Sequence, residues 1–359
     1  MKHRIFTLFS TFALATTLFA QTQVNPYRPG ITAEGITYYL PRTELRVTVV
    51  CERVTKFPGE LKDYSQRYLR LNNVTQEPET TWTIKDVKIT PFGVPDTSRV
   101  FSIPLRKKTV APLASLTAGG VIMSINAEGE EDEVPAVEAI NKKETSNLNP
   151  RNYMTEEILY AGSQAKQAQL IAAEIYDIRD SRSQLSKGQA DNMPKDGQQL
   201  QLMLKQLDTQ EAALMQLFAG TTETETKTYT LTYNPAKETE KDILFRFSSE
   251  FGLVNSDDLS GEPVYISIFD RKTLPAEQID PKQKKLNAEA VRYVVPSTVD
   301  VNIFDSNKNK FATLTTPMAQ FGRVEFLSSE LFNKHITTQV TFNTITGSLK
   351  KITDAALGE

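Results

Sequence analysis

The stretch Ala161–Leu185 reads AGSQAKQAQLIAAEIYDIRDSRSQL, and its small and apolar residues recur every three or four positions. This spacing places them on one face of an α-helix. The stripe begins with alanines and continues through Ile171, Ile175, Ile178 and Leu185. We therefore predict a helix of roughly thirty residues, an estimate that follows from the length of the periodic stretch.

A second helix is predicted directly after the first. The segment between them, residues 188–197, begins and ends with glycine and contains Asp191, Asn192 and Pro194, which favour turns. Two long amphipathic helices joined by a short turn pack antiparallel, as a hairpin. The apolar residues of the second helix have heptad-like spacing and are Leu200, Leu204, Leu207, Leu214 and Phe218.

The two apolar stripes leave the predicted hairpin with apolar surface that the pair cannot bury alone. A third surface must cover it, supplied either by the β parts of the same chain or by a partner protein. The candidate partner-binding residues on the stripes are Ile171, Ile175, Ile178, Leu204, Leu207 and Leu214.

On both sides of the hairpin the pattern is that of β-strands. Short β-branched and aromatic runs, broken by Pro, Gly and Asn, fill residues 36–125 and residues 221–342. One short helix, predicted between Pro58 and Asn73, should lie on a sheet or close one end of a sandwich. The first half of Thr221–Tyr233 is polar at every position, which predicts an exposed or edge strand.

These patterns predict an α+β protein in which two mainly antiparallel, sandwich-like β domains are separated by a long antiparallel helical hairpin. A linker between the first β domain and the hairpin holds the acidic residues Glu128, Glu130, Glu131, Asp132 and Glu133 and should be an exposed loop. The predicted borders are a signal peptide at 1–20, an N-terminal β domain with one short helix at 21–127, the acidic and polar linker at 128–152, the hairpin at 153–218 and a C-terminal β domain at 219–359.

One pair of segments within the β regions is similar. Ile36–Thr43 aligns with Val291–Thr298, and the two share Tyr, Pro and Thr at matching positions. The match is too short to establish a duplication, since a common strand-turn-strand solution explains it equally well.

The first residues predict an export signal. Three basic residues, Lys2, His3 and Arg4, precede an apolar run of about 15 residues that is too short to span a bilayer comfortably. Cleavage after Ala20 would leave Gln21 at the start of the mature chain; an uncleaved anchor is the alternative. There is no cysteine near the cleavage site, so lipid attachment of the bacterial lipoprotein type is excluded. We expect a protein of the periplasm, or one held at the outer membrane through partners, with no membrane insertion of its own after signal removal.

The amino-acid composition excludes several kinds of functional site. The 41 basic and 44 acidic residues give no basic footprint for nucleic acid. The single Cys51 cannot form a disulfide within the chain, and with His335 as the one histidine left after signal removal, a zinc site of clustered Cys and His is excluded. We interpret Cys51 as a core residue and His335 as a surface residue. No glycine-rich phosphate loop and no calcium-loop spacing occurs, so we expect no cofactor and no metal, and we identify no catalytic residue.

Several segments together resemble an exported protein family of Bacteroidetes known as domain of unknown function 4831. The similarity would cover almost the whole mature chain. It implies a cell-envelope protein of a Gram-negative anaerobe with no assigned activity and no catalytic residues. The segments that carry it are Gly35–Thr43, Phe57–Tyr64, Leu69–Asn72, Leu217–Thr222, Leu244–Ser248 and Gly261–Ile268.

Two functions follow from these observations. The first is a non-catalytic binding or scaffolding protein whose partner is another envelope protein, which the missing catalytic motifs and the apolar hairpin favour. The alternative is a glycan-binding or carboxylate-dependent glycan-hydrolysing protein, because the pairing of Asp and Glu side chains is a property of the fold and not of their number. The chain holds a single tryptophan, Trp82, for which we expect core packing or a half-exposed position rather than stacking on a sugar. The sequence does not set the oligomeric state.

Overall fold

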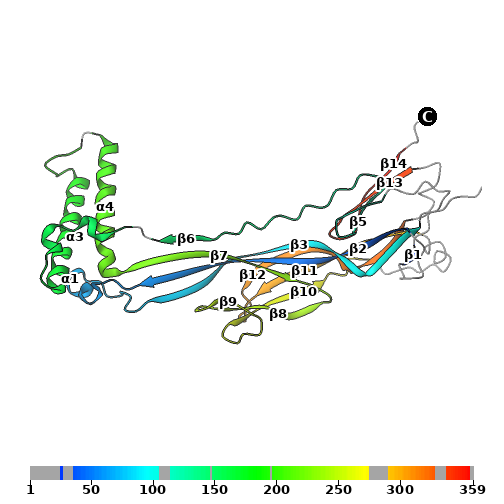
Figure 1. Ribbon diagram of the computed structural model, residues 1–359, viewed down its shortest axis with the longest axis horizontal. Helices are drawn as coiled ribbons and strands as arrows, with labels where there is room; N and C mark the ends of the chain where they lie inside the picture. The colour runs from blue at the N-terminus through cyan, green and yellow to red at the C-terminus, as the bar shows by residue number, and fades with distance from the viewer. Residues whose placement is uncertain are drawn as a thin grey trace, which may run out of the picture.

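The computed structural model describes residues 25–26, 35–104, 114–145, 148–194, 196–274, 290–327 and 337–355. The predicted signal peptide and His335 lie outside the described residues. The described chain is elongated, with its helices gathered at one end and three β-sheets filling the rest of its length (Figure 1). The protein is thus mostly β with several antiparallel sheets and a few helices, as the sequence predicts.

The first sheet forms the long axis of the molecule. Its central strand β2 (Gly35–Phe57) is 23 residues long and pairs antiparallel with β3 (Glu79–Pro104) on one side and with β7 (Thr221–Tyr233) on the other. Two short strands complete it, and the order is β1 (Asn25–Pro26), β3, β2, β7, β6 (Lys142–Thr145).

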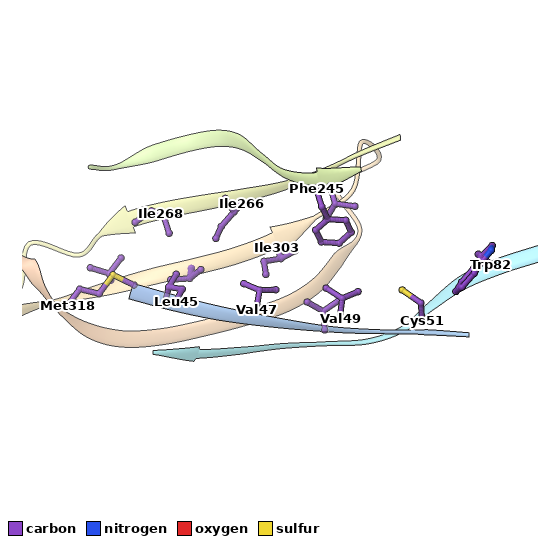
Figure 2. Packing of buried hydrophobic residues seen from close by; sticks show 14 residues of the cluster. Leu45, Val47, Val49, Cys51, Trp82, Phe245, Ile266, Ile268, Ile303 and Met318 are labelled. Atoms are coloured by element: carbon purple, nitrogen blue, oxygen red, sulfur yellow. The ribbon is translucent and has the colours of Figure 1, made fainter. Parts of the chain in front are cut away.

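A second sheet packs against the middle of the first. It contains β8 (Thr239–Ser248), β9 (Gly252–Val254), β10 (Glu262–Asp270), β11 (Val291–Phe304) and β12 (Lys310–Leu327), in the order β12-β11-β10-β8-β9. Alternate residues of β2, namely Leu45, Val47 and Val49, point toward Ile266 and Ile303 of the second sheet (Figure 2). The period of two in a β-strand thus gives β2 one apolar face, which this sandwich buries.

A third sheet lies at the end of the molecule remote from the helices (Figure 1). Its order is β14 (Leu349–Ala355), β13 (Thr337–Phe342), β5 (Ile122–Ile125), β4 (Ala114–Leu116). Val340 and Phe342 of this sheet share a second apolar core with Tyr38 of β2 and Val294 of β11.

The two long hairpins, β2–β3 and β11–β12, each contribute to both apolar cores. In both hairpins the strand ladder is irregular where the similar segments 36–43 and 291–298 carry their proline. The ladder of β2 with β3 shifts register between Tyr39 and Pro41, and the ladder of β11 with β12 shifts between Val295 and Ser297. A proline cannot donate a ladder hydrogen bond and is placed at such bulges, where strands turn from one sheet packing to the next.

The strand pairing crosses the predicted domain borders. β7, which follows the helices, pairs with β2, which precedes them, and β13 pairs with β5. The first and third sheets therefore each combine strands from both sides of the helices, and the predicted domain borders stay a prediction. Pairing between strands so far apart in the chain leaves no mark in the local pattern from which the borders were predicted.

The helices form one group, which we call the helical head: residues 58–71, 150–194 and 196–219. Its long helices are α3 (Gln164–Lys187) and α4 (Gly197–Ala219). α3 has 24 residues, fewer than predicted, because the Ser163 side chain accepts a hydrogen bond from Lys166 N and starts the helix only there. The short elements are η1 (Lys62–Tyr64), α1 (Ser65–Leu69), η2 (Pro150–Tyr153) and α2 (Glu156–Leu159).

Between the sandwich and the head the first sheet continues as a stalk made of residues 52–57, 79–84, 142–145 and 221–226. Trp82, where the stalk joins the sandwich, still packs in the core shared with the second sheet. Most side chains of the stalk are polar, as expected for the first half of Thr221–Tyr233; the exceptions are Val54, Phe57, Trp82 and Ile84. Ion pairs connect the strands of the stalk and its junction with the sandwich: Arg53 with Glu225, Lys85 with Glu52 at 2.6 Å, and Lys143 with Glu223 at 3.1 Å. That half of β7 is not an edge, however, because β6 pairs with it.

The predicted acidic linker is a long extended segment, which we call the strap (residues 126–141). It connects β5 of the third sheet to β6 of the stalk and follows the length of the molecule (Figure 1). Most of its acidic residues are exposed, as expected of a loop. Asp132 is the exception, because its carboxylate accepts a hydrogen bond from Thr344 N at 2.7 Å and pairs with Lys350 Nζ at 2.6 Å.

Candidate functional site

The helical head contains the candidate partner-binding residues, and its two long helices pack antiparallel. Arg179 Nε lies 2.6 Å from Glu211 Oε1, and Arg182 Nη1 lies 2.8 Å from Asp208 Oδ1 and 2.7 Å from Glu211 Oε2. Because the residue numbers rise along α3 as they fall along α4, these contacts fix the relative direction of the helices. The Glu211 side chain is only 13% exposed and is held by two guanidinium groups.

The interior of the head is closed by the chain itself. Ile171, Ile175, Ile178 and Leu214, four of the six candidates, are buried there together with Leu61, Leu69 and Ile158. The third surface that the sequence required thus comes from the short helices around residues 61–69 and 158. These four side chains do not form an accessible surface, and their binding to a partner stays a prediction that nothing in the structure tests.

The segment 58–71 is attached to both long helices, which corrects its expected place on a sheet or at the end of a sandwich. Leu61 N donates to Leu217 O at 2.7 Å and Ser65 Oγ donates to Phe218 O at 3.0 Å, so this segment satisfies carbonyl groups at the end of α4. On α3, the Tyr176 hydroxyl donates to Tyr68 O at 3.0 Å. The physical reason is that free carbonyl groups at a helix end need donors, which the local apolar spacing of residues 61–71 does not reveal.

The far end of the hairpin is less completely covered. Leu204 and Leu207, the other two candidates, are half-buried. Continuing the register of the ion pairs toward the start of α4 places Leu202 and Met203 opposite the last turn of α3. Met193 lies in the connection between α3 and α4. We call these three residues the tip; the Leu202 side chain is 69% exposed, and Met193 and Met203 are exposed as well. The heptad pattern missed Leu202, because it lies off the predicted stripe.

Residues considered for catalysis are placed where they cannot react readily. Cys51 is buried in the core between the first and second sheets, and burial raises the pKa of its thiol to about 11. Trp82 is buried in the same cluster and is not available to stack on a sugar. Within the described ranges, no group of three or more His, Cys, Asp or Glu side chains is arranged to hold a metal ion.

Two cavities of the described chain are small or shallow and lack aromatic linings. One, of about 110 Å³, lies between the strap and the third sheet and is lined by Gly93, Asp132 and Thr344 among others. Its only carboxylates are Glu131 and Asp132, and Asp132 is already paired with Lys350. The other cavity is open and lined by polar side chains such as Gln339 and Lys351. The glycan-binding or glycan-hydrolysing alternative gains no support from them and stays a prediction.

Comparison with known proteins identifies the family of the chain. A family model described as domain of unknown function (DUF4831) matches residues 34–350, so the chain belongs to this family. No curated protein and no solved structure matches it. Among the described helices, none combines the length and apolar character required to cross a bilayer.

Proposed function

We propose that this member of the DUF4831 family is an exported, non-catalytic cell-envelope protein that binds or scaffolds another envelope protein through its helical head. The observation that carries the proposal is the exposed apolar tip, Met193, Leu202 and Met203, at the connected end of α3 and α4, in the helical head at one end of the elongated molecule (Figure 1). Exposed apolar side chains that gather at one place mark interaction surfaces more often than scattered ones do.

The construction of the head supports this proposal. Its interior is complete, so the exposed residues of the tip are not needed to bury Ile171 or Ile175. The stalk separates the head from the sandwich and would allow a partner to reach the hairpin without contacting the sheets. The candidate residues Leu204 and Leu207, half-buried next to the tip, would extend the contact surface.

The proposed location rests on the sequence alone. The basic start of the chain, its short apolar run and the small residue Ala20 have the form of an export signal. We propose that the mature protein resides in the periplasm or is held at the outer membrane by its partners. In this proposal the helical hairpin binds the partner, and the β-sheets support the hairpin.

The experiment compares partners captured from crosslinked cell envelopes by three full-length proteins. They are the wild type, the double variant Leu202→Asp with Met203→Asp, and the control Leu259→Asp, in which an 83% exposed leucine of the loop between β9 and β10 is replaced by the same acidic residue. We expect one partner set shared by wild type and control and lost from the tip variant, with unchanged helical circular dichroism. Identical partner sets for all three proteins would remove the tip from the proposal.

A further inference from the structure

The second half of β7 has a free outer edge. β7 pairs with β2 along its whole length, Thr221–Tyr233, but with β6 only along Glu223–Thr226. In the part of the chain that the structure describes, the outward N–H and C=O groups of residues 227–233 have no backbone partner. A strand edge of this kind accepts a further strand through main-chain hydrogen bonds.

The strap follows this edge in the register that would lengthen β6. β6 places Lys142 opposite Thr226, and continuing this antiparallel register by two residues places Ile140 opposite Thr228. The structure joins these two residues through the threonine side chain and not through a ladder. Ile140 N donates to Thr228 Oγ1 at 3.0 Å, and the same hydroxyl donates to Ile140 O at 3.3 Å.

Apolar residues at every second position of the strap also suit a strand on this edge. The same register sets Pro135, Val137 and Ala139 opposite the odd-numbered residues of 229–233. Directly opposed residues of an antiparallel pair lie on the same face of a sheet. Those β7 residues, Tyr229, Leu231 and Tyr233, pack against the core between the first and second sheets, so the apolar strap residues would face that core.

The strap is held at its other end by the turn between β13 and β14 and by β14 itself. The Asp132 carboxylate accepts from Thr344 N and pairs with Lys350 Nζ, while Asp132 N donates to Thr344 Oγ1 at 2.9 Å. We call Asp132, Thr344 and Lys350 the latch. Between the latch and Ile140, the strap receives one hydrogen bond, from Arg46 Nη1 to Pro135 O at 3.1 Å.

We infer that the strap is an intramolecular cover of the β7 edge, and that opening the latch lets an extended peptide with apolar residues at every second position, like the strap itself, add to residues 227–233 as a strand. The strap is itself such a segment, and it competes with any added peptide for the β7 edge. This inference concerns a surface distant from the tip and does not depend on the proposed function of the head.

The test uses the strap's own sequence as the probe. A fluorescein-labelled synthetic peptide, EVPAVEAINK (residues 133–142), is titrated into three full-length proteins and followed by fluorescence anisotropy. They are the wild type, Asp132→Ala, and the control Glu130→Ala, which removes the same charge from an exposed neighbour. We expect Asp132→Ala to bind the peptide about tenfold more tightly than the other two, since apparent affinity scales with the fraction of molecules whose edge is open. Hydrogen exchange should show new protection of residues 227–233.

Equal affinity of the peptide for all three proteins would overturn the inference, as would protection outside residues 227–233. Equally tight binding of a scrambled peptide of the same composition to Asp132→Ala would also contradict it. If Asp132→Ala disturbs the third sheet, Thr228→Val serves as the second variant, because it removes the hydroxyl that bonds Ile140 and keeps a branched side chain on β7. We expect Thr228→Val to raise peptide affinity in the same direction.

Discussion

The hydroxyl oxygen of Tyr38 accepts a hydrogen bond from the backbone N–H of Arg292, 3.1 Å away and 254 positions along the chain. This contact joins β2 to β11 inside the core that they share with the third sheet. Burial of Tyr38 raises the pKa of its hydroxyl, which keeps the group neutral. The two ends of the described chain are therefore parts of one packed structure, and changes in either should affect both.

The interior of the head and its tip should respond differently to truncation. Ile171→Ala removes a fully buried side chain, and we expect it to destabilise the head by about 2–5 kcal/mol because a cavity remains. Leu202→Ala, at an exposed position of the tip, should change the stability by less than about 0.5 kcal/mol. Urea unfolding followed by helical circular dichroism measures both. Equal losses would show that Leu202 belongs to the interior.

Two carboxylates of the charge cluster between α3 and α4 should contribute unequally to the stability of the protein. Glu211→Gln removes the charge that holds Arg179 and Arg182, and we expect a loss of about 1–2 kcal/mol, because this carboxylate is mostly buried. Asp208→Asn changes a side chain that is 59% exposed and should cost under about 0.5 kcal/mol. The same urea titration compares them, and a larger effect for Asp208→Asn would refute the assignment of Glu211 as the centre of the cluster.

The connection from α4 to β7 depends on a glycine. Gly220 has φ 84°, and a Cβ atom there would lie 1.9 Å from Phe57 O. We expect Gly220→Ala to cost about 2 kcal/mol or more, from the left-handed backbone and the contact with a rigid carbonyl group. Gly162→Ala is the matched control, because a Cβ atom at Gly162 meets nothing within 4 Å. Thermal unfolding that is the same for both variants would contradict this interpretation of the connection.

The buried Cys51 predicts a loss of stability at alkaline pH. Its folded-state pKa is raised to about 11, so between about pH 9 and 11 the unfolded chain releases the thiol proton while the folded chain retains it. The contribution is fully present below pH 9 and is lost as the pH rises through the folded-state value. Urea unfolding at intervals from pH 7 to 10.5 should show a steeper decline for the wild type than for Cys51→Ala. A thiol reagent that labels the native protein readily at pH 8 would show that Cys51 is accessible.

The elements of the fold were predictable where they depend on local pattern. The stripe from Ala168 to Leu185 and the turn chemistry at Gly188 correspond to α3 and its end, since Gly188 adopts φ 70°. The similar segments at 36–43 and 291–298 correspond to the two strands that shift register at their proline. The spacing and type of neighbouring residues are enough to predict these features.

Features that depend on distant contacts were not predictable. No local pattern indicates that β7 pairs with β2, or that Ser65 binds the end of α4. The role of Asp132 in the latch was equally hidden, since its neighbours Glu131 and Glu133 are exposed and have the same charge. The burial of Ile171 by the segment 58–71 follows from the same kind of contact, which a one-dimensional stripe does not specify.

The most direct test of the account is site-specific photocrosslinking in living cells. A photoreactive amino acid replaces Leu202 at the tip in one strain and the exposed Leu259 of the loop between β9 and β10 in another. We predict a discrete crosslinked product with an envelope protein from position 202 and none from position 259. No product from position 202, or the same products from both positions, would contradict a partner-binding role for the helical head.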